Sequence, residues 1–100
     1  MRVFKFGGAS VKDAEAVKNV ASIIHSHDGP LVVVVSAMGK TTNALQKVVN
    51  AYFYKKEDVN ICIDEVKNYH QNIMQQLFAP NHPVFVTVNN LFVEIEWTVE

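Results

Sequence analysis

Two loops in the first half of the sequence carry residue types that bind phosphate groups. In the first, residues 5–10, two glycines let backbone N–H groups approach an anion closely, and Lys5 adds a full positive charge. The start of the helix expected after it adds a positive partial charge. The second loop, residues 36–43, offers hydroxyl groups, an amide and another helix start. Together they predict a site for a phosphorylated ligand.

Neither loop matches the common nucleotide-binding motifs. Residues 39–41 resemble the end of a Walker A loop, but that motif requires a glycine where this sequence has Val34. A dinucleotide fingerprint that starts at Gly7 requires further glycines where the sequence has Ala9 and Lys12. A P-loop NTPase and a Rossmann dehydrogenase are therefore not supported.

The hydrophobic pattern around these loops predicts a βαβ unit. Residues 2–6 suit a short strand, and residues 31–35, with four β-branched side chains, predict a strand buried on both faces of a parallel sheet. Between them, Ser10 stands three residues before Asp13, which predicts a capping-box start for a helix. The apolar face of that helix recurs at spacings of three and four: Val11, Ala14, Val17, Ala21, Ile24. A parallel βαβ unit places both loops at the carboxyl edge of its strands, where ligands bind in open α/β sheets.

The second half of the sequence predicts helices. One starts at Thr41 or Thr42 and carries Ala44, Leu45, Val48, Val49 and Tyr52 on one side. The next repeats apolar residues at spacings of three and four: Val59, Cys62, Val66, Tyr69, Ile73, Leu77. Residues 84–88 have strand propensity, but the wider pattern over residues 84–100 favours a helix.

Composition excludes several classes of protein. The 100 residues allow one small domain, and a net charge of −1 excludes a strongly basic nucleic-acid binder. No apolar run approaches the roughly 20 residues that span a bilayer, so we expect no membrane partner. The single cysteine, Cys62, indicates a reducing compartment, and we expect the cytoplasm. Cys62 lies on an apolar helical face and is expected in the core, and the histidines show no metal-ligand spacing, so no metal-binding residue is predicted.

Two strands are too few for the covered sheet that residues 31–35 require. We therefore expect a fragment of a larger α/β domain that forms a homo-oligomer through exposed apolar surface and open strand edges.

The two loops resemble the signatures of a known family. Lys5-Phe6-Gly7-Gly8-Ala9-Ser10-Val11 resembles the opening motif of aspartokinases, with Ala9 where threonine is usual. Residues 33–43 resemble the second aspartokinase signature, in which Val-Val-Ser-Ala is followed by Thr-Asn or Thr-Asp. The resemblance is close over residues 2–45 and diffuse over residues 50–100.

The resemblance implies a fold, a reaction and site residues. Residues 1–100 would be the N-terminal portion of an amino-acid kinase catalytic domain, a three-layer α/β/α sandwich that uses ATP and Mg²⁺. An aspartokinase transfers the ATP γ-phosphoryl group to the side-chain carboxylate of L-aspartate, which gives 4-phospho-L-aspartate, the first step toward lysine, threonine and methionine. Since the family's later substrate, magnesium and adenine residues would lie beyond Glu100, the resemblance implies that residues 1–100 alone are inactive. Lys5 and Gly8 would be catalytic; the ATP-binding residues would be Lys5, Phe6, Gly7, Gly8 and Ser10; Ser36 and Thr42 would lie on the aspartate side.

Other interpretations remain open. Another amino-acid kinase relative would phosphorylate glutamate, acetylglutamate or a nucleotide. A non-catalytic α/β interaction module would use the apolar stripe of residues 59–77 and the apolar segment 84–95 as a binding surface. On the residues alone, Lys5 could be a solvated strand-end lysine, Gly7 and Gly8 a tight turn, and Ser36 and Thr42 cap or turn residues.

Overall fold

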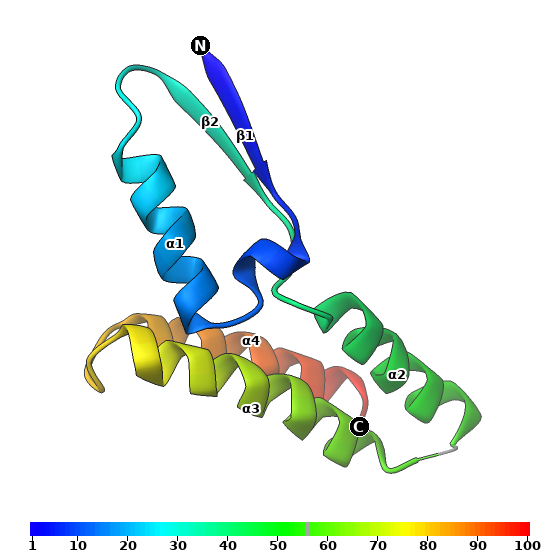
Figure 1. Ribbon diagram of the computed structural model, residues 1–100. Helices are drawn as coiled ribbons and strands as arrows, with labels where there is room; N and C mark the ends of the chain where they lie inside the picture. Colours follow the sequence, from blue (N-terminus) through cyan, green and yellow to red (C-terminus); the bar gives the residue numbers. More distant parts are fainter. Residues whose placement is uncertain (56) are drawn as a thin grey trace. The chain divides into compact units, whose positions relative to one another are not determined.

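The computed structural model describes residues 1–55 and 57–100. They form two compact units, Met1–Thr41 and Thr42–Glu100 (Figure 1). The first contains both strands and the helix between them, and the second is helical. The predicted change from βαβ to helices along the chain is confirmed.

The first unit is a βαβ unit. Strands β1 (Arg2–Phe6) and β2 (Leu31–Val35) pair in parallel, with Arg2 opposite Leu31 and Phe6 opposite Val35. Helix α1 (Ala14–His25) connects them and lies alongside the two strands in Figure 1. Because the strands run in the same direction and in register, the loops that follow Phe6 and Val35 leave the same edge of the sheet.

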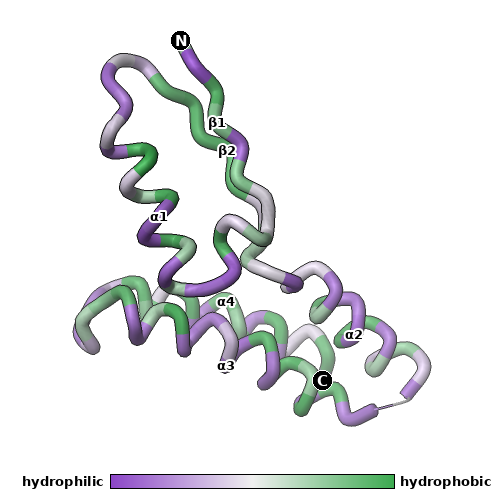
Figure 2. Tube along the Cα trace, in the orientation of Figure 1, coloured by the Kyte–Doolittle hydropathy of each residue, from purple (hydrophilic) through white to green (hydrophobic). Residues whose placement is uncertain are grey.

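Strand β2 is apolar along its whole length but is not buried. Figure 2 shows it in the hydrophobic colour, yet Val33 is 36% exposed and Val35 is 53% exposed. The expectation of a strand buried on both faces is wrong for this structure. The physical reason is that the sheet has two strands among the described residues, too few to cover its faces.

Helix α1 begins later than its sequence signals predict, so the Ser10 cap is wrong. A short 3₁₀ helix, η1 (Gly8–Val11), follows the glycines, and Ser10 lies inside it. The cap is Asp13, which has extended backbone and accepts a hydrogen bond at Oδ1 from the Ala16 N–H at 2.8 Å. A carboxylate two residues beyond η1 therefore starts the helix, and the Ser10 hydroxyl is left for other contacts.

The second unit contains α3 (Val59–Leu77), α4 (Val84–Thr98) and all of α2 (Thr41–Tyr54) except its first residue. The helix predicted within residues 84–100 is confirmed, and it includes residues 84–88, which have strand propensity. Helical spacing brings Val88, Phe92, Ile95 and Val99 to one core, with Phe92 7% exposed, whereas alternating strand geometry would divide these residues between two faces.

Residues from all three helices share this core. It contains Val48, Ala51, Cys62, Ile63, Val66 and Phe92. The predicted face of α3 is confirmed, and Ile63 and Met74 are buried in addition to it. Lys47 on α2 forms ion pairs with Glu57 at 3.5 Å and with Glu65 on α3 at 3.2 Å. Within residues 1–55 and 57–100, no helix has the length and hydrophobicity to cross a membrane.

Candidate phosphate-binding site

Two backbone hydrogen bonds join the loops that follow β1 and β2. The Ser36 N–H donates to the Phe6 carbonyl oxygen at 2.9 Å, which continues the parallel ladder by one step. Beyond it, the Gly39 N–H donates to the Gly8 carbonyl oxygen at 3.0 Å. The structure thus brings the first predicted loop and the start of the second to one edge of the sheet, entirely within the first unit.

The two glycines of the first loop have different surroundings. A Cβ atom on Gly8 would clash with the Gly39 carbonyl oxygen and lie 3.1 Å from that of Ala37, so a side chain there requires the backbone to shift. A Cβ atom on Gly7 would have no neighbour within 4 Å. Gly8 is therefore needed for close packing of the two loops, while Gly7 borders open space that a ligand can enter.

The first loop has backbone donors available for an anion. Ser10 donates its N–H to the Gly7 carbonyl oxygen at 3.0 Å, which closes the turn. The N–H groups of Gly7, Gly8 and Ala9 donate to no carbonyl of another element in the part of the chain that the structure describes. Successive unpaired N–H groups in a turn form an anion-binding concavity.

The charges near the loops favour an anion. Residues 1–12 and 31–43 contain Arg2, Lys5, Lys12 and Lys40 and no acidic residue. Lys5 is exposed on β1 opposite Val34 and forms no ion pair with the described residues, so its ammonium group is available to a ligand.

The positive partial charge expected from the α1 N-terminus is not available to a ligand. Asp13 caps that terminus and Glu15 lies in its first turn, so carboxylates, not a ligand, face the positive end of the helix dipole. The candidate site depends on Lys5 and the loop N–H groups instead.

The remaining predicted residues differ in placement. Phe6 is half-buried and its ring meets Phe4 edge-on with centroids 6.3 Å apart, so its side chain packs and its carbonyl joins the loops. Ser36 is exposed beside the first loop. Thr42 belongs to the second unit, so the geometry of the first unit does not include it.

Sequence reasoning gave two residues of the second loop no part in the site: it named Thr41 only as a possible helix start, and Gly39 only within the rejected Walker A match. Thr41 is 8% exposed and its hydroxyl donates to the Met38 carbonyl oxygen at 2.5 Å, which holds the loop where α2 begins. Gly39 has a φ of +57°, a left-handed backbone that glycine adopts readily. The only local signal was the glycine itself, within Met38-Gly39-Lys40.

The described residues provide no group of three or more His, Cys, Asp or Glu side chains that could hold a metal ion. Cys62 is 1% exposed in the helical core, where it donates from Sγ to Glu57 Oε2 at 3.6 Å. Burial first, and then the hydrogen bond to Glu57, raise the pKa of the Cys62 thiol. A buried thiol that stays protonated is an inert core residue.

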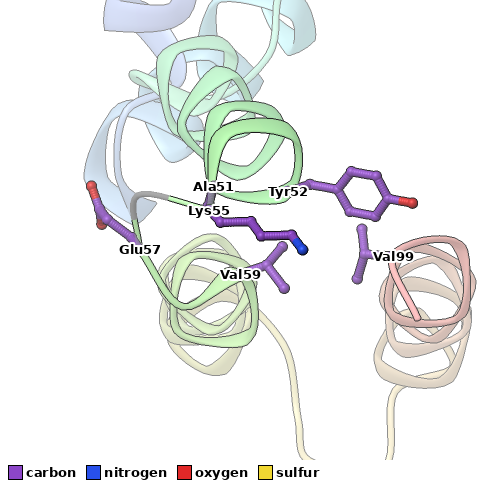
Figure 3. Close-up of a pocket in the computed structure, with 6 residues that line it drawn as sticks. All are labelled: Ala51, Tyr52, Lys55, Glu57, Val59 and Val99. Atoms are coloured by element: carbon purple, nitrogen blue, oxygen red, sulfur yellow. The ribbon is translucent and has the colours of Figure 1, made fainter.

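A separate pocket of about 430 Å³ lies in the second unit (Figure 3). In Figure 3, Tyr52, Lys55, Val59 and Val99 point toward one another, whereas the Glu57 carboxylate points away. None of the residues predicted to bind ATP or aspartate lines this pocket. It is an open depression lined by both polar and apolar side chains, with Lys55 as the one basic residue among the described residues that line it. The phosphate-binding features lie in the first unit instead.

Comparison with known proteins gives one family. The family model described as "Amino acid kinase family" matches residues 1–89. Aspartokinase 2, chloroplastic, of Arabidopsis thaliana is 59% identical over 46 residues, or 45% of this chain and 8% of that protein. Bifunctional aspartokinase/homoserine dehydrogenase 1, chloroplastic, of Zea mays is 33% identical over 78 residues, or 77% of this chain and 8% of that protein.

The similarity is partial in length and concerns sequence. The matched part of this chain spans 8% of the length of each of these relatives. No solved structure gives a significant match to the chain.

Proposed function

Because the chain belongs to the amino acid kinase family, we propose that residues 1–100 are the N-terminal part of an aspartokinase catalytic domain. The observation that carries the proposal is the edge of the β1–β2 sheet, where the Gly7–Gly8 loop and the Ser36 loop are joined by backbone hydrogen bonds. Similarity to proteins named aspartokinases favours aspartate over other acceptors.

In the proposed reaction, a side-chain carboxylate oxygen of L-aspartate attacks the γ-phosphorus of ATP. The bond from that phosphorus to the bridging oxygen breaks, and the products are 4-phospho-L-aspartate and ADP. Phosphoryl transfer requires positioning and charge stabilisation more than covalent help from the protein. Lys5 supplies positive charge to the phosphates, and the N–H groups of Gly7 and Gly8 donate to the transferring phosphoryl group.

The described residues fit the phosphates of ATP better than they fit a metal ion. Open space beside Gly7, unpaired loop N–H groups and the unpaired ammonium group of Lys5 suit a polyanion. No carboxylate cluster among the described residues suits Mg²⁺, so we assign none of them to the metal. When bound, Mg²⁺ would neutralise phosphate charge.

Four further residues have proposed supporting roles. Phe6 and Ser10 shape the glycine loop through their backbones, by the bonds to Ser36 and Gly7. Ser36 and Thr42 contact aspartate or the phosphoryl group through their hydroxyl groups, which are exposed.

The test is acyl phosphate formation by the full-length protein, trapped with hydroxylamine, with aspartate and glutamate as rival acceptors. We expect an aspartate-dependent product. Replacing Lys5 by alanine should lower kcat about 100-fold or more, the usual cost of removing one group that stabilises transition-state charge. The control is Lys18→Ala, which removes the same charge from the exposed surface of α1 and should leave the rate unchanged.

The rival functions give different results. Product with glutamate, acetylglutamate or a nucleotide, but not with aspartate, would identify another member of the family. A folded protein that binds no MgATP would favour the non-catalytic interaction module. If Lys18→Ala lowered kcat as much as Lys5→Ala does, the effect would come from any lost surface charge, and Lys5 would have no specific role in the site.

Two properties of the whole protein are also proposed. Residues 1–100 alone are inactive. They also self-associate, because β2 exposes Val32, Val33, Val34 and Val35, and sedimentation of the isolated segment tests the self-association. We propose a reducing, cytoplasmic compartment from the single cysteine, whereas the relatives are named chloroplastic, and cell fractionation separates the two.

A further inference from the structure

Gly39 links the two loops at a point that the phosphate-binding motif does not explain. Its N–H donates to the Gly8 carbonyl oxygen at 3.0 Å. Its own carbonyl oxygen occupies the space that a Cβ atom on Gly8 would need, so the two residues meet backbone to backbone. Both belong to the first unit, and Gly39 has a φ of +57°.

This contact fixes the direction of one peptide group of the glycine loop. A trans peptide is planar, with its C=O and N–H pointing in opposite directions, and the described part of the chain has no cis peptide bond. Gly39 holds the C=O of the peptide between Gly8 and Ala9. The N–H of the same peptide, which belongs to Ala9 and is one of the unpaired donors, must therefore point away from Gly39.

We propose that Gly39 is a positioning residue for phosphoryl transfer. Its left-handed backbone aims its N–H at the Gly8 carbonyl and so orients the Ala9 N–H for the transferring phosphoryl group. This inference rests on the proposed function, because it concerns the same loop. It also explains why Ala9 can stand where aspartokinases usually have threonine: the contribution of this position is a main-chain donor that does not depend on its side chain.

The inference predicts an unusual order of substitutions at Gly39. Asparagine tolerates the left-handed region better than alanine does, and valine tolerates it least. If backbone conformation is what matters, kcat should fall in the order Gly, Asn, Ala, Val. If side-chain size matters, the larger asparagine should be worse than alanine.

The experiment measures kcat and the KM for MgATP in the full-length protein and its Gly39→Asn, Gly39→Ala and Gly39→Val variants. We expect kcat to fall about tenfold or more in Gly39→Ala, because small displacements of a transition-state donor are costly, with KM changed less than about threefold. Gly29→Ala is the matched control, since Gly29 also has a positive φ, of +91°, and a methyl group added there would meet nothing within 4 Å. It should keep both constants.

A second measurement does not depend on the acceptor. MgADP with aluminium fluoride mimics the transferring phosphoryl group, so its affinity should fall in Gly39→Ala while that of MgADP alone is retained. Unchanged kcat and unchanged affinity in folded Gly39→Ala would overturn the inference, as would Gly39→Asn being worse than Gly39→Ala. Absence of aspartate phosphorylation by the wild-type protein would instead overturn the proposed acceptor, and the fluoroaluminate measurement would still test Gly39.

Discussion

The two units of the chain use opposite means of holding their residues in place. In the first, the residues with chemical potential lie on loops joined by main-chain hydrogen bonds, beside a strand whose valines are exposed. In the second, three helices enclose apolar side chains, and Cys62 and Ile63 are 1% and 2% exposed. The geometry of the two loops in the first unit depends on backbone conformation, and the geometry of the second unit depends on side-chain packing.

The difference shows why the phosphate-binding features depend on glycines. A loop that binds an anion with N–H groups needs close backbone approach, and an added side chain interferes with it wherever that side chain enters the space between the backbones, as at Gly8. A helical core needs the reverse, because filled volume provides its stability. Substitutions that add or remove a few carbon atoms should therefore have opposite tolerances in the two units.

The largest effect is expected in the helical core. Ile63→Ala removes a fully buried side chain and should lower the free energy of unfolding by about 2–5 kcal/mol. Ile61→Ala removes the same atoms from a side chain that is 60% exposed on the same helix, and should cost less than about 1 kcal/mol. Urea unfolding followed by far-UV circular dichroism measures both. Equal losses for the two variants would contradict the described core.

The next effect concerns the glycine loop, where adding one methyl group should be harmful at one position and harmless at its neighbour. Gly8→Ala forces backbone oxygens of Gly39 and Ala37 to move, and should cost about 1–3 kcal/mol of stability. Gly7→Ala meets no atom, and Gly7 has an ordinary φ of −75°, so the change should be neutral or stabilise by up to about 1 kcal/mol. Urea unfolding again compares them, and a larger loss at Gly7 would show that the loops pack differently.

A smaller effect should be equal in the two units, because both contain the same kind of helix cap. Asp13 caps α1 through the Ala16 N–H at 2.8 Å, and Asp58 caps α3 through the Asn60 N–H at 2.9 Å. Each aspartate-to-alanine change should cost about 0.5–2 kcal/mol. Amide hydrogen exchange should rise at the first turn of the affected helix alone. Asp64→Ala, on the exposed surface of α3, is the control and should leave exchange unchanged.

Local pattern predicted the elements well and their surroundings less well. Apolar spacing was sufficient for both strands and for the helices, including residues 84–98, because periodicity is a property of the chain itself. It did not predict the exposure of Val35, which depends on how many strands cover the sheet, or the cap at Asp13, since Ser10 offered an equally good local signal.

The candidate site was predictable only where it depends on local residue types and not on contacts between distant residues. Lys5, Gly7 and Gly8 stand out by residue type, and a parallel βαβ unit brings their loop to the Ser36 loop. The Gly39–Gly8 hydrogen bond joins residues far apart in sequence and involves no side chain, so no pattern of residue types predicts it. Ile63 lies next to the predicted apolar stripe of residues 59–77. Its burial likewise depends on the width of the surface that covers α3.

The smallest expected effect is a dependence on pH that arises in the helical unit. Burial, and then the hydrogen bond to Glu57, raise the pKa of Cys62 in the folded protein. Because the folded pKa is raised, the protonated thiol contributes stability below its ordinary pKa of about 8.5, and that contribution is lost as pH rises toward the folded pKa. Under reducing conditions, the stability of the wild type should therefore decline more steeply above about pH 8 than that of Cys62→Ala. The cavity that alanine leaves lowers stability at every pH, so the difference in slope isolates the thiol. Equal slopes would mean that Cys62 ionises as easily in the fold as in the unfolded chain, and would contradict its place in a dry core.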